Sequence, residues 1–125
     1  MKIYQKFVFL LNAIFTFVGA IILLIFPQTI IGLIGGNSIS HDIQLTIQFA
    51  GGIFAFLLML ISVWGIFAKR AQISLWILLI FHGLSFLSSL LAAILVNPQI
   101  ALNCIFHVIF LIFLIILERK LSLEK

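Results

Sequence analysis

Two histidines are the residues in this sequence whose type and position suggest chemistry. His82 and His107 lie in two successive apolar runs, nine residues from Ile73 and ten residues from Leu117 respectively. If these runs are antiparallel helices with Ile73 and Leu117 at one membrane surface, both rings lie roughly 14 to 15 Å deep. Two imidazoles at one depth can bind haem iron, ligate a metal or hydrogen-bond a quinone carbonyl.

The alternative for the same pair is a packing role, in which each neutral imidazole hydrogen-bonds a neighbouring helix. Asn103 lies one turn from His107 on the same face and is its expected partner, while Ser85 continues the face of His82. His82, His107, Asn103 and Ser85 are therefore the candidate ligand-binding residues. We expect no metal, because two imidazoles are too few ligands and Cys104 points about 100° away from Asn103.

Charged residues are absent from the interior of every apolar run. A proton-coupled exporter of similar length needs a membrane-embedded carboxylate, but the first run offers only Asn12 and Thr16 at the corresponding depth. The chain also has no phosphate loop, nucleophile elbow or metalloprotease motif. We therefore expect no catalytic residues and a protein that is not an enzyme.

Four long apolar runs must position the two histidines. They extend over about 7–26, 43–68, 73–96 and 100–117, and each is long enough for a membrane-spanning helix. With 65% apolar and 8% charged residues, the chain cannot cover a water-facing surface. No run alternates with a period of two, which excludes a β-barrel. The predicted fold is all-α: a single transmembrane domain over 1–125, folded as an integral membrane four-helix bundle.

The basic residues predict how this bundle is oriented. All of them fall on one side of it: Lys2, Lys6, Lys69, Arg70, Arg119, Lys120 and Lys125. The connections on the other side, 27–42 and 97–99, contain neither Lys nor Arg. The positive-inside rule then predicts a multi-pass protein of the cell (inner) membrane, with cytoplasmic N- and C-termini and His41 outside. The positive charge is explained by topology and contact with anionic membrane lipid, so we expect no nucleic-acid partner.

Small residues mark the helix faces that we expect to pack. Gly51 and Ala55 form a pair with four-residue spacing in the second run, and Ser85, Ser89 and Ala93 repeat at that spacing in the third. Such faces let helix backbones approach closely in lipid, where no hydrophobic force drives helix association. We expect packing within the bundle; contact in a homo-oligomer or a larger membrane complex is the alternative.

Several short motifs have counterparts in a known family of membrane proteins. They are the glycine-containing end of the first run (19–27), the loop 31–35, the segment QFAGG at 48–52, and the serines that follow Gly83. These motifs resemble the DoxX/DoxD-like superfamily of small bacterial four-helix membrane proteins. The resemblance implies the same fold and, from some members, an association with oxidoreductase complexes and thiol or quinone chemistry. The chain departs from the family at Gln48, where a basic residue is common, and at His107, where an acidic residue often stands.

Three functions from different classes fit these features. The first is a non-enzymatic accessory, assembly or structural membrane subunit that acts through helix association and has no cofactor. The second is a redox-associated subunit that binds quinone or haem near His82 and His107. The third is a protein that binds a small lipophilic molecule in a cavity of the bundle.

Overall fold

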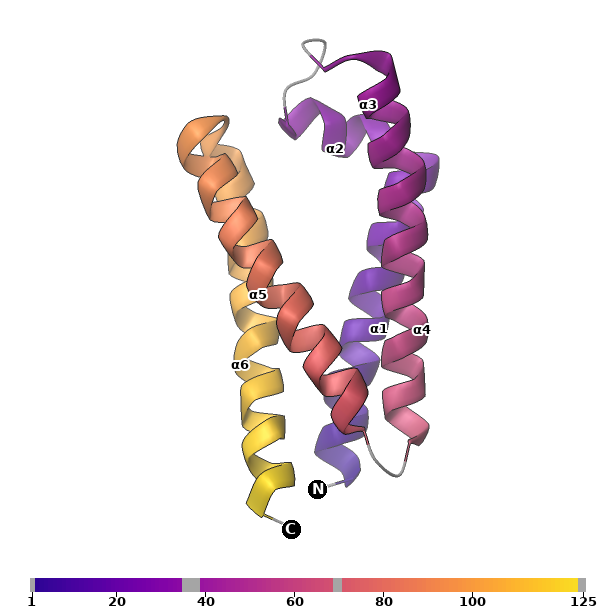
Figure 1. The fold of residues 1–125 in the computed structure, drawn as a ribbon, viewed down its shortest axis with the longest axis vertical. Helices are drawn as coiled ribbons and strands as arrows, with labels where there is room; N and C mark the ends of the chain where they lie inside the picture. The colour runs from indigo at the N-terminus through magenta and orange to yellow at the C-terminus, as the bar shows by residue number, and fades with distance from the viewer. Residues whose placement is uncertain (1, 35–38, 69–70, 124–125) are drawn as a thin grey trace.

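The computed structural model describes residues 2–34, 39–68 and 71–123, and nearly all of this part of the chain is helical, with no strand in it (Figure 1). Four helices there are long and apolar enough to cross a membrane: Ile3–Ile25, His41–Phe67, Gln72–Leu95 and Pro98–Leu123. The prediction of an all-α fold with four such helices is therefore confirmed for the described residues.

The helices follow the predicted order. The elements are α1 (Lys2–Ile25), α2 (Pro27–Ile34), α3 (His41–Thr46), a π-helical turn (Ile47–Gly51), α4 (Gly52–Phe67), α5 (Gln72–Leu95), a 3₁₀ turn (Pro98–Ile100) and α6 (Ala101–Leu123). The short helix α2 lies in the predicted loop, and α3, the π turn and α4 together form the second long helix. α1 begins at Lys2 rather than Phe7, and α6 continues past Leu117 to Leu123, because helical hydrogen bonding does not stop where hydropathy falls.

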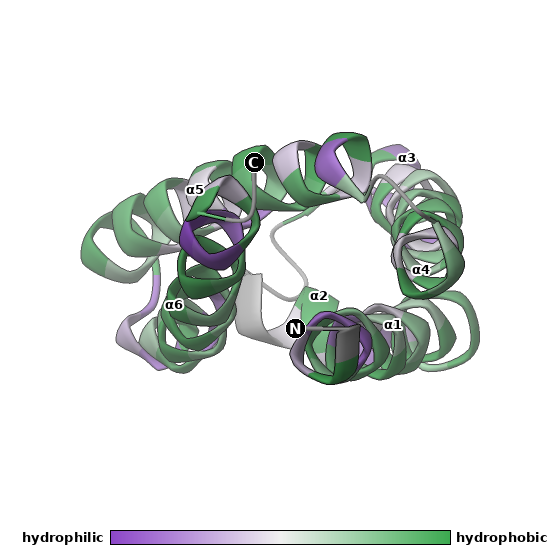
Figure 2. Ribbon diagram, turned by 90° about the horizontal axis from the view of Figure 1, so that it is seen from below, coloured by the Kyte–Doolittle hydropathy of each residue, from purple (hydrophilic) through white to green (hydrophobic). Residues whose placement is uncertain are grey.

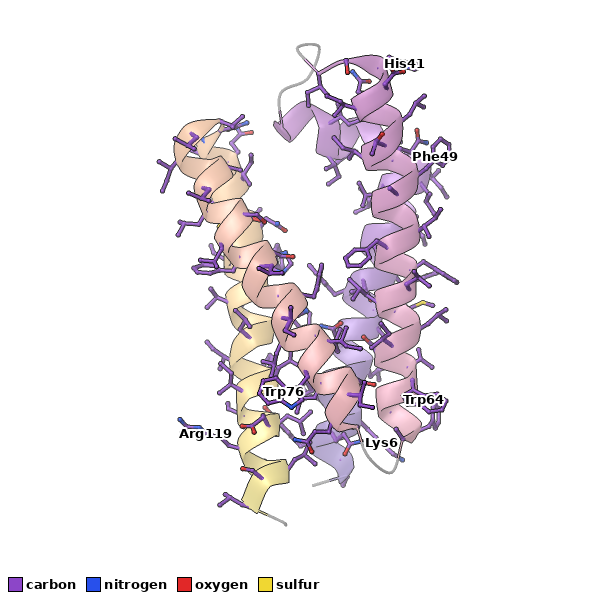
Figure 3. The ribbon with its side chains drawn as sticks, viewed as in Figure 1. Lys6, His41, Phe49, Trp64, Trp76 and Arg119 are labelled. Atoms are coloured by element: carbon purple, nitrogen blue, oxygen red, sulfur yellow. The ribbon has the colours of Figure 1, made fainter. Side chains whose placement is uncertain are left out.

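The four long helices form two antiparallel pairs, α1 with α4 and α5 with α6 (Figure 1). The pairs converge at the end that carries both termini and diverge at the other end, where α2 and α3 lie. Figure 2 shows hydrophobic residues around most of each long helix, as is typical of helices that contact lipid tails. In Figure 3, Lys6 and Arg119 lie near the end with the termini, and His41 lies at the opposite end.

A hydrophobic core joins the two pairs. Each of the four spans contributes to it: Val8 and Phe9 from α1, Leu58 from α4, Leu75 and Leu78 from α5, and Leu114 and Leu117 from α6. At the same end, the Tyr4 hydroxyl donates to the Phe113 carbonyl at 3.3 Å, and Phe7 packs edge-to-face on Phe113. The pairs are thus packed together close to the termini.

Two glycines set the closest approach of α4 to α1. A Cβ atom added at Gly65 would lie 2.6 Å from ring atoms of Phe9, and one added at Gly52 would lie 2.5 Å from Cγ of Leu24. Both glycines are buried, and no larger residue fits at Gly65 without movement of the fully buried Phe9 ring.

The expected packing residue Gly51 lies at the edge of this contact. It is half-buried, as is Ala55, and a Cβ atom at Gly51 would make an ordinary 3.4 Å contact with Leu23. The closest contact of this part of the helix with α1 therefore falls at Gly52, one residue after the expected Gly51. On α5, Ser89 and Ala93 are buried and Ser85 is half-buried, and Ser89 bonds to α6 through Asn103.

Two glutamine side chains cap helix ends inside the α1–α4 pair. Gln5 Nε2 donates to the Gly65 carbonyl and Gln48 Nε2 donates to the Leu24 carbonyl, each at 2.9 Å. Both carbonyls belong to the last turn of their helix, where the helix itself supplies no N–H partner. The glutamine side chains supply the missing donors. An uncharged amide at position 48 serves this purpose.

Candidate functional site

A buried hydrogen-bonded chain links all four long helices. It consists of Ser62 from α4, Asn12 from α1, His82 from α5 and His107 from α6. The first three side chains are fully buried and His107 is 4% exposed. We call these four residues the polar chain.

The distances in the polar chain are those of hydrogen bonds throughout. Nδ1 of His82 lies 2.8 Å from Nδ1 of His107, and Nε2 of His82 lies 2.6 Å from Nδ2 of Asn12. The Ser62 hydroxyl lies 3.0 Å from Oδ1 of Asn12 and 2.8 Å from the Leu58 carbonyl of its own helix. A hydroxyl has a single proton, so it donates to one of these two oxygens at a time.

The orientation of the Asn12 amide in the structure, with its Nδ2 toward His82, assigns the ring protons. The Asn12 amide donates, so Nε2 of His82 must accept and Nδ1 of His82 carries the proton. That proton is donated to Nδ1 of His107, which leaves the proton of His107 on its Nε2. Both rings are neutral in this arrangement, and the chain runs in one direction from Ser62 to His107.

Three phenylalanine rings surround the two imidazoles. Phe110 stacks on His82 with ring centroids 4.9 Å apart, and Phe81 meets the same ring edge-on at 4.9 Å. Phe15 meets His107 edge-on at 6.0 Å. These rings come from α6, α5 and α1, so the two imidazoles lie inside an aromatic shell built by three helices.

The structure brings His82 and His107 together, as their equal predicted depth suggests, but gives Asn103 a different partner. Nδ2 of Asn103 donates to the hydroxyl of Ser89 at 2.7 Å rather than to His107. Ser85 is half-buried, and its backbone carbonyl accepts from the Ser88 hydroxyl. Asn103 and Ser85 are therefore not members of the polar chain.

Sequence reasoning missed that Asn12 and Ser62 join the histidines. Asn12 is conspicuous as an amide in an apolar run, but sequence alone does not show which helix it faces. Ser62 lies among apolar residues of the second run and carries no signal of its own. The neighbouring Thr16 does not bridge helices, because its hydroxyl donates to the Asn12 and Ala13 carbonyls of its own helix.

The spacing of the two imidazoles fits a shared proton. A metal ion holds each nitrogen about 2.0 Å away, so two nitrogens on opposite sides of iron are about 4 Å apart. The Nδ1 atoms at 2.8 Å are too close for that arrangement, and haem between the rings would require them to separate. Nε2 of His107 differs from the other three ring nitrogens, because it has no hydrogen bond to any residue that the structure describes.

No protein-family model, no curated protein and no solved structure matches this sequence. The function is therefore argued from the geometry of the polar chain and its surroundings.

Proposed function

We propose that this protein is a multi-pass protein of the cell membrane, with cytoplasmic termini, that acts through helix association as an accessory or structural subunit. The observation that supports a structural role over a ligand-binding one is the polar chain, which takes one buried polar residue from each span and pairs the facing nitrogens of its two histidines with each other. On this basis His82 and His107 hold the helices in position. We also propose membership of the DoxX/DoxD-like superfamily, on the motifs given above.

The physical reason is the cost of unpaired polar groups in lipid. An unsatisfied donor or acceptor in the hydrocarbon region costs several kcal/mol, and no water is present to replace a lost partner. Each helix can therefore satisfy its polar residue only by taking the rotation and depth that place it in the chain. This arrangement selects one packing of four helices that are otherwise apolar nearly all round.

Photo-crosslinking in cells tests the association. A photoreactive amino acid at Leu84, which is 64% exposed on α5, should give a discrete protein adduct if this outward face meets a partner or a second copy. The same group at Leu78, which is fully buried, is the matched control and should give none. Adducts with lipid alone at Leu84 and at further outward positions on all four spans would refute association.

Cysteine labelling tests the membrane orientation independently. In a Cys104→Ala background, a cysteine introduced at His41 should react with an impermeant thiol reagent in intact cells. A cysteine introduced at Ser122 should react only after the membrane is opened. The opposite pattern would reverse the proposed topology, and labelling of both in intact cells would refute an even number of spans.

A second candidate function, quinone binding beside His107, rests on the free Nε2 of that ring. No fully buried side-chain nitrogen or oxygen in the described part of the chain lacks a hydrogen-bond partner, so this Nε2 touches open space. Its N–H could donate to a quinone carbonyl. An organic extract of the purified protein tests this: quinone in the wild type that is lost in His107→Phe would establish the second candidate. We expect no quinone, and no haem Soret band in the absorption spectrum.

A further inference from the structure

A cleft of about 750 Å³ lies where the two helix pairs diverge. Its walls come from the ends of α5 and α6 away from the termini, the 3₁₀ turn between them, and one residue of α2 (Figure 1). The residues that line the cleft include Ile30, Ser88, Ser89, Ala92, Asn103 and Phe106. The cleft is separate from the polar chain, none of whose four members lines it.

Most of the cleft wall is apolar, and its hydrogen-bonding side chains are Ser88, Ser89, Gln99 and Asn103. No charged side chain is among the described residues that line it. Asn103 and Ser89 bond to each other, but the Ser89 hydroxyl proton has no acceptor in the part of the chain that the structure describes. The second amide hydrogen of Asn103 and the side-chain amide of Gln99 are likewise without acceptors there. The cleft therefore presents several unused donors to an apolar space.

The position of these donors indicates the kind of ligand. Ser89 is six residues from the end of α5, so it lies about 9 Å from the end of that helix along its axis. α5 is about 36 Å long and the hydrocarbon core of a bilayer is about 30 Å thick, so if α5 spans the bilayer, Ser89 lies about 6 Å inside the hydrocarbon region, below the ester groups of the surrounding lipid. A ligand with a carbonyl oxygen at this depth and an apolar chain below it matches the wall.

The cleft is smaller than a further spanning helix. A helix about 10 Å wide and 30 Å long occupies roughly 2,400 Å³, about three times the volume available. Small-molecule sites typically measure about 300–1,000 Å³, a range that includes this cleft. The volume of the cleft therefore suits a small molecule or one chain of a lipid.

We propose that the cleft holds one acyl chain of a glycerolipid drawn about 6 Å below the ester level of the surrounding lipid, so that its ester carbonyl accepts hydrogen bonds from Ser89 and Asn103. The inference rests on the membrane-spanning part of the proposed function, which cysteine labelling at His41 and Ser122 tests separately. The uncharged wall favours the ester and chain region of the lipid over its phosphate, because a buried phosphate would need a cationic partner.

Photolabelling in vesicles tests the proposal. The full-length protein is reconstituted in phosphatidylcholine vesicles containing a trace of phosphatidylcholine with a diazirine on one acyl chain, and adducts are mapped by mass spectrometry. We expect adducts to concentrate on Ala92 and Phe106 rather than on outward-facing residues such as Leu84. Ala92→Leu should reduce labelling in the cleft at least about threefold, and Ser89→Ala should reduce it about two- to tenfold, the factor that the loss of one hydrogen bond gives.

The control is Ala50→Leu, the same substitution at an exposed position on the other helix pair. It should leave the labelling pattern unchanged. If Ala92→Leu has a lowered melting temperature, Ser88→Leu is used in its place to block the cleft, because Ser88 is an exposed residue of the cleft wall. Labelling spread evenly over all lipid-facing residues, or unaffected by both blocking variants, would overturn the proposal. So would loss of cleft labelling on addition of a short-chain quinone, since the site would then take a different ligand.

Discussion

Substitutions in the polar chain should cost stability according to the number of hydrogen bonds that each member makes to other helices. Asn12→Ala removes two: its donation to Nε2 of His82 and its acceptance from Ser62. His82→Leu also removes two, to Asn12 and to His107. Ser62→Ala and His107→Leu lie at the ends of the chain and each remove one.

The magnitude follows from interhelical hydrogen bonds measured in membrane proteins, which contribute about 0.6 kcal/mol on average and at most about 1.7 kcal/mol. The two end variants should therefore lose about 0.6–1.7 kcal/mol of unfolding free energy, and the two interior variants about twice as much. Asn12→Ala leaves only Nε2 of His82 unpaired, because the Ser62 hydroxyl still reaches the Leu58 carbonyl at 2.8 Å. The unfolding free energy lost in Asn12→Ala should thus not exceed that lost in His82→Leu, which leaves both Asn12 and His107 without their His82 partner.

Unfolding by SDS titration in mixed micelles, followed by circular dichroism, measures these differences. Thr16→Val is the matched control: Thr16 is 3% exposed, but its hydroxyl bonds only to its own helix, so no interhelical hydrogen bond is lost and the change should be smaller than that of any of the four polar-chain variants. In the double variant Asn12→Ala/His82→Leu the loss should be smaller than the sum of the single losses, because both remove the same bond. Equal losses at interior and end positions, or a Thr16→Val loss as large as that of Asn12→Ala, would refute the reasoning.

Two further predictions concern the contact between α1 and α4. Gly65→Ala should lower the melting temperature, at a cost of about 1–3 kcal/mol, because its Cβ would lie 2.6 Å from the Phe9 ring; Gly83→Ala, whose Cβ meets nothing within 4 Å, should not lower it. Gln48→Ala should cost about 1 kcal/mol in the same SDS titration, since it removes the donor to the Leu24 carbonyl. An unchanged melting temperature in Gly65→Ala would contradict the packing of Gly65 against Phe9. An unchanged unfolding free energy in Gln48→Ala would contradict the capping of the Leu24 carbonyl.

Hydropathy in the sequence predicted the number and order of the long helices. It is a local property, because about twenty successive residues decide whether a segment suits a bilayer, and no tertiary contact is needed. The same locality predicted that all basic residues lie on one side and that His82 and His107 share a common depth, since depth depends only on the distance along the helix. The helix ends differed by several residues, as at Lys2 and Leu123, because backbone hydrogen bonding extends into polar segments.

Only the tertiary structure decided which residues face one another. One residue along a helix is a rotation of about 100°, so a small error in helix rotation changes the partner of every side chain. This is why the closest contact of α4 falls at Gly52 and Gly65 rather than at Gly51, and why Asn103 bonds to Ser89 instead of His107. It is also why Asn12 and Ser62 could not be assigned to the polar chain from sequence: their helices are apolar on nearly every face, and rotation is set by where a buried polar group finds its partner.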